Sequence, residues 1–297
     1  MGACPCNVSF GNTGKANCEP IQDVTAKLIF VRTFADDGTK NAIPVGTEVD
    51  DAYITARLND PDVSKRWYPS RRLVSVEDVR GDNTTESIDG VDYITDKGQR
   101  TFVGFSPKTD SVYLGKIAQG ECGQFSVFTV DKSNRIIGET STDGLNLYPV
   151  AIEEGTYYTR LVKTTQATVQ KTEIGFTYSI LANDADLRMI LATGDILGAT
   201  GLLDVNAANS GESTTGFVSV LTLDYGYYGA NLAVVGWLLA DFALYNVTQD
   251  TAVVITSVTE APDGTYTFVI PAQTAADELT LTGVKDGFEL ESTILIP

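Results

Sequence analysis

Histidine is absent from this chain of 297 residues. Because histidine is the commonest acid or base near neutral pH and a frequent metal ligand, its absence excludes Ser-His-Asp, Cys-His and histidine-zinc catalysis. Glycine-rich phosphate cradles are missing too, since no segment runs into Gly-Lys-Ser/Thr and no Gly-x-Gly-x-x-Gly occurs. An enzyme would have to work through carboxylates alone. We therefore expect a protein that is not an enzyme and that holds no cofactor.

Long apolar runs are also missing. The longest, residues 232–244, contains Asp241 and is too short to span a bilayer. No charged-then-apolar segment precedes a small-residue cleavage site near residue 1. We therefore expect no membrane partner, no signal peptide and a product of the cytoplasm.

Basic residues are scarce: 21 Lys and Arg stand against 39 Asp and Glu, for a net charge of −18. This balance opposes nucleic-acid binding, which depends on clustered Lys and Arg. The imbalance is greatest from residue 196 onward, where twelve carboxylates face Lys285 alone. DNA is thus not expected to be bound specifically.

The four cysteines allow two interpretations. They can be reduced, packed thiols, which is the default for a cytoplasmic chain, or they can form one four-thiolate metal site. The Cys-x-Cys spacing is tighter than the usual two to four intervening residues, which favours the first interpretation. The residues concerned are Cys4, Cys6, Cys18 and Cys122.

Alternation of apolar and polar residues recurs along the chain, whereas helical periodicity is scarce, and this pattern is typical of an all-β protein. Residues 28–31 are apolar on both faces and predict a central strand. Two hairpins are expected. One pairs residues 91–94 with 102–105 around Asp96-Lys97-Gly98, and the other pairs 125–129 with 136–137 around residues 131–134.

Residues 110–119 predict one short helix across the sheet, because an Asp leads a set of spaced apolar residues. Residues 182–191 predict a second. Between the hairpins and this segment, the alternation of Ile174, Phe176, Tyr178 and Ile180 predicts a strand with one apolar face.

Two domains are expected, residues 1–195 and 196–297, because residues 194–216 are rich in Gly, Ala, Asn and Ser and read as a boundary loop. Short strands then recur in the second domain, which is the pattern of an immunoglobulin-like β-sandwich. The strands are expected at residues 218–223, 242–247, 252–258, 266–270, 279–284 and 288–296.

Three segments carry a resemblance to a known family: Cys4-Pro5-Cys6-Asn7 with the following Asn12 to Cys18, Gly98 to Phe102, and Ser126 to Gly138. Together with the overall layout, they resemble structural proteins of tailed phages that infect Bacteroidetes. An N-terminal β-domain with one helix and an immunoglobulin-like appendix is similar to phage tail tube (major tail) proteins.

The resemblance implies that the N-terminal domain forms a ring, commonly hexameric, and that the rings stack into a conduit for DNA. Unpaired strand edges would then be satisfied by the backbone of identical neighbours. The second domain would decorate the exterior of the virion tail, assembled in the host cytoplasm. The alternatives are another virion part, such as a tail terminator, neck ring or capsid decoration protein, and a host-surface carbohydrate-binding module.

A cluster of basic and aromatic residues is the expected inter-subunit interface, because Arg forms paired hydrogen bonds with carboxylates of a neighbour. The competing interpretation is a solvated loop whose Trp packs on its own core. A second aromatic cluster, Tyr225 to Tyr228, either packs the domains together or binds host carbohydrate. The residues of the basic cluster are Lys65, Arg66, Trp67, Arg71 and Arg72.

Overall fold

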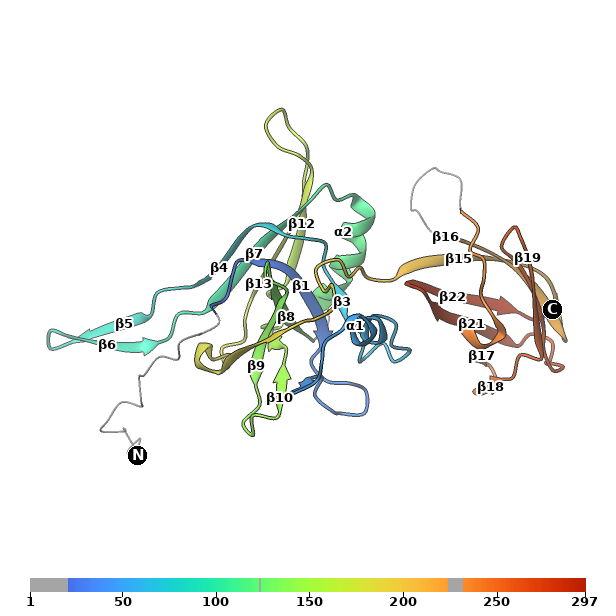
Figure 1. Cartoon of the computed structure of the whole chain (residues 1–297), viewed down its shortest axis with the longest axis horizontal. Helices are drawn as coiled ribbons and strands as arrows, with labels where there is room; N and C mark the ends of the chain where they lie inside the picture. Colours follow the sequence, from blue (N-terminus) through green and yellow to red (C-terminus); the bar gives the residue numbers. More distant parts are fainter. Residues whose placement is uncertain (1–20, 123, 224–231) are drawn as a thin grey trace.

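The computed structural model describes residues 21–122, 124–223 and 232–297. Strands dominate, and two short α-helices accompany them, which confirms the all-β expectation with minor α. Figure 1 shows a larger first body with a long hairpin arm at one end and a smaller second body at the other. Tyr225 to Tyr228 and the cysteines up to Cys18 lie outside the described residues.

The first body contains an eight-stranded sheet built around β1. Residues 28–31 are buried on both faces, so the expected central strand is confirmed. Ile29 and Val31 face one core, whereas Leu28 and Phe30 face another. The strand order is β2 (Ile43–Pro44), β10 (Asn146–Tyr148), β9 (Arg135–Thr140), β8 (Phe125–Asp131), β1 (Thr25–Arg32) and β3 (Tyr68–Pro69), with β11 (Val150–Ala151) on β8 and β14 (Leu187–Leu191) on β9.

The hairpin of β8 and β9 is confirmed. Asn134 takes a positive φ of 63° in its turn, and the Asp131 carboxylate accepts the backbone N–H groups of Ser133 and Arg135. Asp and Asn side chains that bond nearby backbone in this way are the usual turn formers. The local sequence therefore specifies this turn.

A four-stranded antiparallel sheet covers the second core of the first body. Ile174, Phe176 and Tyr178 are buried there as expected, whereas Ile180 lies beyond the strand and is exposed. The strands, in order, are β12 (Tyr158–Val162), β13 (Lys171–Thr177), β7 (Arg100–Pro107) and β4 (Val74–Arg80).

The helix expected at residues 110–119 is confirmed as α2 (Ser111–Ala118), capped by the Asp110 carboxylate. The helix expected at 182–191 is wrong. That segment forms a 3₁₀ turn, η2 (Asp184–Asp186), and then β14, whose residues pair with β9 from Glu139 to Arg135. A ladder of backbone hydrogen bonds outweighs the weak helical preference of so short a segment.

Helix α1 (Asp51–Leu58) was not expected. The Asp50 carboxylate accepts the Tyr53 N–H and caps the helix, and Ile54 is its buried residue. Tyr53 and Leu58 also pack against this core, but eight residues are too few to show the repeated apolar stripe that would predict a helix. The Asp50 cap was the available signal.

The hairpin expected between residues 91–94 and 102–105 is wrong. Instead β5 (Thr84–Ile88) pairs with β6 (Val91–Asp96), and β7 pairs with β4 and β13. The turn is Asp89-Gly90, where both residues take positive φ angles of 53° and 78°, as a two-residue hairpin turn requires. Gly98 serves another purpose, because a Cβ there would overlap the carbonyl of Gly81 on the opposite strand.

The second body is a single hydrogen-bonded sheet of eight strands, curled over one core. The rings of Phe242 and Phe268 meet edge to face at 5.0 Å, so opposite ends of the sheet face each other as in a sandwich. The order is β18 (Thr251–Val253), β17 (Phe242–Asn246), β21 (Glu278–Lys285), β22 (Phe288–Leu295), β15 (Leu203–Ser213), β16 (Gly216–Leu223), β20 (Thr265–Val269) and β19 (Ser257–Ala261), with η3 (Leu239–Asp241) before β17.

Two strand expectations in the second body need correction. Residues 203–213, expected within the boundary loop, form β15, whose small polar residues pair with β16 and β22. The strand expected at 252–258 is divided into β18 and β19, because the chain turns from one edge of the curled sheet to the other at residues 254–256. Residues 254–256 contain no Gly or Asn that would have predicted this break between the strands.

The two bodies meet around residues 196–203. Ile196 packs in the first core and β15 begins at Leu203, so the change of core lies a few residues beyond the expected boundary at 195/196. The Lys27 ammonium donates to the carbonyls of Leu197, at 2.8 Å, and of Ala199. This side chain fixes the connecting segment, residues 195–199, to β1.

Within the described ranges, no helix is long and apolar enough to cross a membrane.

Candidate assembly surfaces

The arm, defined as residues 81–99, is a two-stranded ribbon that continues β4 and β7 beyond their sheet (Figure 1). Strands β5 and β6 pair only with each other, and every residue from 79 to 97 is exposed. The Gly81 N–H donates to Gln99 O at 2.9 Å where the arm leaves the sheet. An isolated two-stranded hairpin is only marginally stable in water, so contact with another surface would stabilise this ribbon.

The tip of the arm, defined as residues 84–96, has one apolar face. The register pairs Ile88 with Val91 and Glu86 with Tyr93, and side chains of directly paired residues share a face. Ile88, Val91 and Tyr93 are each about half exposed, at 50%, 53% and 53%. Hydrophobic side chains that remain in water along one face of a ribbon are typical of a surface that binds another protein.

A network of ions anchors the base of the arm. Arg100 bonds both oxygens of Asp78, at 2.6 and 2.7 Å, and lies over the Tyr178 ring. Burial disfavours the charge on Arg100, yet its hydrogen bonds to Asp78 and the nearby negative charges raise its pKa. Arg80 reaches Asp184 at 2.9 Å. The base of the arm is therefore held rigidly, although the tip is exposed to solvent.

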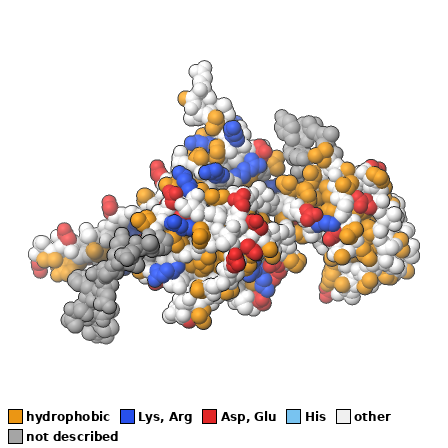
Figure 2. Space-filling view, viewed as in Figure 1, with side chains coloured by type: hydrophobic (Ala, Val, Ile, Leu, Met, Phe, Trp, Pro, Cys, Tyr) orange, Lys and Arg blue, Asp and Glu red, His pale blue; other side chains and the backbone are white. Residues whose placement is uncertain are grey.

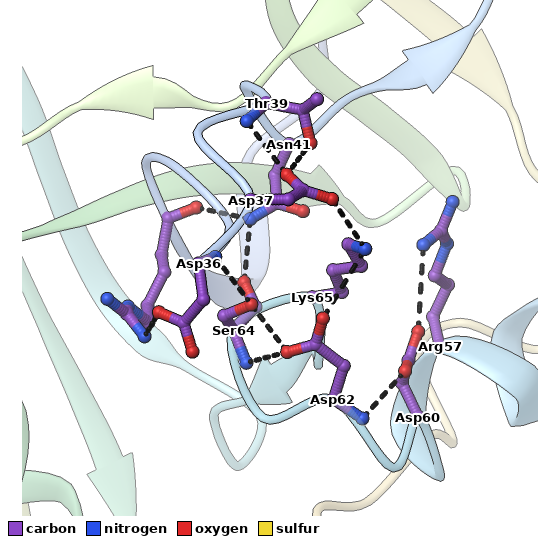
Figure 3. Close-up of polar contacts among 10 residues, drawn as sticks. Asp36, Asp37, Thr39, Asn41, Arg57, Asp60, Asp62, Ser64 and Lys65 are labelled. Carbon is purple, nitrogen blue, oxygen red and sulfur yellow. Dashed lines mark hydrogen bonds and ion pairs between the residues drawn. The ribbon is translucent and has the colours of Figure 1, made fainter.

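Lys65 of the expected interface is engaged within its own chain (Figure 3). Its ammonium lies 2.9 Å from Asp37 and 3.4 Å from Asp62, and these contacts join the loop between β1 and β2 to the loop after α1. The hydrogen bonds to both carboxylates raise the pKa of Lys65, which stays charged at physiological pH. Lys65 therefore supports the fold of these loops.

Arg66 and Trp67 lie inside the chain, where they cannot contact a neighbour. Arg66 is 3% exposed, donates to Asp60 O at 2.9 Å and forms an ion pair with Glu289 of the second body at 2.6 Å. Trp67 is 4% exposed and packs against Phe128 in the first core. The interpretation that the Trp packs on its own core is thus the one that the geometry supports.

Arg71 and Arg72 are exposed, as an interface requires. The Arg71 guanidinium lies 4.5 Å from the centre of the Tyr113 ring. Neither arginine forms an ion pair with a described residue. Of the five expected interface residues, these two remain available to a partner.

Three lysines that are distant in sequence join these arginines. The Lys108 N–H donates to Gln170 O at 2.8 Å, and Lys171 pairs with both Pro107 and Val162 in the sheet, which places Lys163 alongside. We call this set the cationic end of the four-stranded sheet. It consists of Arg71, Arg72, Lys108, Lys163 and Lys171.

No lysine of the cationic end forms an ion pair within the described part of the chain. Figure 2 shows Lys and Arg gathered near α2 and the base of β12. Sequence reasoning missed the three lysines because they come from different strands, and only strand pairing brings them together.

A cleft of about 1250 Å³ lies between the two bodies. Tyr68, Tyr113 and Tyr157 line it together with Lys116, which forms an ion pair with Asp204 across the junction at 2.6 Å. Burial raises the pKa of Tyr157, so that this hydroxyl stays protonated. The cleft is spanned by the Lys116–Asp204 and Arg66–Glu289 ion pairs, which join the two bodies.

The cysteine hypothesis stays a prediction. Three of the four cysteines lie outside the described residues, and the structure describes no side chain for Cys122, which ends the 3₁₀ helix η1 (Gln119–Cys122). Among the residues that the structure describes, no group of three or more His, Cys, Asp or Glu is placed to hold a metal ion.

Comparison with family models, curated proteins and solved structures gave no match to this chain. Its function is therefore argued from the arm, the strand edges and the charges described above.

Proposed function

We propose that this chain is a structural protein of a tailed bacteriophage, whose copies assemble into hexameric rings that stack into the tail tube. The chain acts without catalysis, by its geometry, and DNA passes through the lumen without specific binding. Its partners are identical copies and other tail proteins. It is assembled in the cytoplasm of the host bacterium and resides in the virion tail.

The arm carries this proposal. A ribbon whose residues 79–97 are all exposed, and whose strands pair only with each other, gains little stability within its own chain. Its base is nevertheless fixed by the Arg100–Asp78 pair. A rigid base beneath an uncovered tip supports a role of the arm as a connector between subunits, because contact with another copy would bury the apolar face of the tip.

The open edge of β4 supports the same proposal. β4 pairs on one side with β7, and its other side has no strand partner among the described residues. Such an edge invites another strand. A bulge lies between Val74 and Glu77, so pairing with a neighbour would involve the regular part of β4, up to Arg80.

The distribution of charge agrees with a conduit that does not bind DNA. The second body contributes Lys285 as its one basic residue, and that ammonium lies 2.8 Å from Asp241. The first body, which would line the lumen, also carries more Asp and Glu than Lys and Arg, 27 against 20 in residues 1–195, and an excess of negative charge repels phosphate. We place the second body on the outside of the tube, since it is joined to the first body at the end opposite the arm (Figure 1).

Negative-stain electron microscopy of two proteins tests the proposal. The first is the full chain and the second is a variant in which Asn-Gly replaces residues 82–98. Because Gly81 and Gln99 are already hydrogen-bonded to each other, Asn-Gly closes the shortened hairpin with a favourable two-residue turn. We expect stacked rings from the full chain and monomers with unchanged circular dichroism from the variant.

A full chain that stays monomeric at every concentration would contradict the proposal. Isolated rings that never stack would instead indicate a tail terminator or neck ring. Rings from the shortened variant would show that the strand edges suffice and that the arm is dispensable.

A further inference from the structure

The two ends of the four-stranded sheet carry opposite charge. The cationic end lies where β4 and β13 begin and β7 and β12 finish. The arm leaves from the other end, and its tip holds four carboxylates without any Lys or Arg. The carboxylates are Glu86, Asp89, Asp92 and Asp96.

Apolar side chains accompany the charge at both surfaces. The tip presents the exposed Ile88, Val91 and Tyr93, and the cationic end presents Val74 and Val169, which are 43% and 57% exposed. Apolar contact gives the free energy of association, whereas complementary charge sets the orientation and accelerates encounter. The two surfaces therefore match in both respects.

A tip cannot reach the cationic end of its own chain. The eight residues of β7 separate the two and span about 25 Å in an extended strand. The arm then continues away from the sheet (Figure 1). Only another molecule can bring the two surfaces together.

We propose that the tip of the arm of one copy docks on the cationic end of the four-stranded sheet of a second copy. This inference rests on the proposed function and names the surface that receives the arm. Because the two surfaces differ, the contact is heterologous: each copy offers one tip and one cationic end. Used head to tail, such a contact closes into rings or continues as filaments, whereas reciprocal exchange of arms between two copies would stop at a dimer.

The neighbouring carboxylate of Asp110 caps α2 by accepting the Tyr113 N–H at 2.7 Å, and the five cations of this end outnumber it. Arg71 and Lys171 lie over the rings of Tyr113 and Phe105, at 4.5 and 3.8 Å. These rings hold the two cations at the surface without neutralising them, so that their charge stays available to the tip.

Charge reversal tests this contact by sedimentation velocity at low salt. Glu86→Lys/Asp89→Lys reverses the charge of the tip at one residue on its apolar face and one in its turn, and Lys108→Glu/Lys163→Glu reverses the cationic end. Because like charges at an interface are strongly unfavourable, we expect each pair alone to weaken association at least about ten-fold. The four substitutions together should restore it, since opposite charges again face each other. Glu278→Lys/Glu291→Lys, at exposed sites of the second body, makes the same change of charge and should leave association unchanged.

Each of the other possible outcomes contradicts a specific claim. If the tip and cationic-end variants assemble like the unmodified chain, the docking contact is wrong and the proposed function stands on the strand edges. If each pair disrupts assembly and the combination does not restore it, the two surfaces do not face each other. If the unmodified chain itself remains monomeric, both proposals fail.

Discussion

The two bodies of this protein solve the problem of burying a sheet in different ways. The second body curls one sheet over a single core, so that its strands alternate between buried and exposed residues, as in β17 with Phe242, Leu244 and Asn246 inside. The first body buries β1 on both faces and extends an arm into solvent. The second body closes around one core within the chain, whereas the first leaves its arm exposed, and the proposed assembly would cover that arm.

The contrast extends to charge. Nearly all Lys and Arg belong to the first body, and the second retains Lys285. A self-contained body needs no steering charges, and its acidity keeps it apart from similar surfaces. In the proposed assembly the first body uses both signs of charge, one at the tip and one at the cationic end. Folding around a closed core and association with other copies would then belong to separate halves of one chain.

Phe268→Ala should have the largest effect and should act on the second body alone. The Phe268 ring stacks on Phe217 at 4.7 Å and meets Phe242, so truncation leaves a cavity that costs about 3–5 kcal/mol of unfolding free energy. Urea unfolding followed by the fluorescence of two single-tryptophan versions, Trp67→Phe and Trp237→Phe, reports each body separately, because Trp67 lies in the first core and Trp237 in the second. A simultaneous shift of both signals would show that the bodies unfold together.

Lys27→Met should have the next largest effect and should loosen the connection between the bodies. The substitution leaves the carbonyls of Leu197 and Ala199 without their donor, which we expect to cost about 1.5–3 kcal/mol. Hydrogen exchange should accelerate in residues 195–199 and remain slow in β17. Unchanged exchange in the connecting segment would contradict this role.

The same lysine predicts a dependence on pH. Burial lowers the pKa of Lys27 from 10.5 to about 8 in the folded chain, so between these values the unfolded chain binds more protons than the folded one. Stability relative to Lys27→Met should therefore rise as the pH increases from 8 to 10.5. Urea titrations of both proteins at several pH values measure the difference, and a flat difference would contradict it.

Arg66→Met should have a smaller effect, centred on the junction. It removes the pair with Glu289 and the bond to Asp60 O, but Glu289 is one-third exposed and regains water. We expect a loss of about 1–2 kcal/mol in the coupling of the two bodies. Small-angle X-ray scattering should show a wider range of separations, and an unchanged profile would assign the junction to the Lys27 contacts alone.

Ile88→Thr/Tyr93→Thr should have the smallest effect on the isolated chain. Both residues are about half exposed in a strand, so the unfolding free energy should change by less than about 0.5 kcal/mol. Assembly, measured by light scattering, should nevertheless be lost, because the apolar face of the tip is gone. A variant that assembles normally would remove the tip from the interface.

Local sequence signals predicted correctly the elements whose residues interact mainly with their neighbours in sequence. The apolar run at 28–31, the Asp131 turn and the Asp110 cap predicted a strand, a hairpin and a helix that the structure contains. Asp89-Gly90 was equally readable as a hairpin turn, and the arm would have been found from it. The turn predicted at residues 96–98 is wrong because Asp96-Lys97-Gly98 carries a turn signal similar to that of Asp89-Gly90, where the chain turns.

The all-β class, the lack of histidine chemistry and the unequal charge of the two halves follow from composition and local pattern alone. Contacts between distant segments, in contrast, bury Arg66 and Trp67 and bring Lys108, Lys163 and Lys171 to the same end of the sheet as Arg71 and Arg72. It also converted residues 187–191 into a strand of the first sheet. Burial, register and charge proximity depend on pairing between distant segments, and local sequence does not encode that pairing.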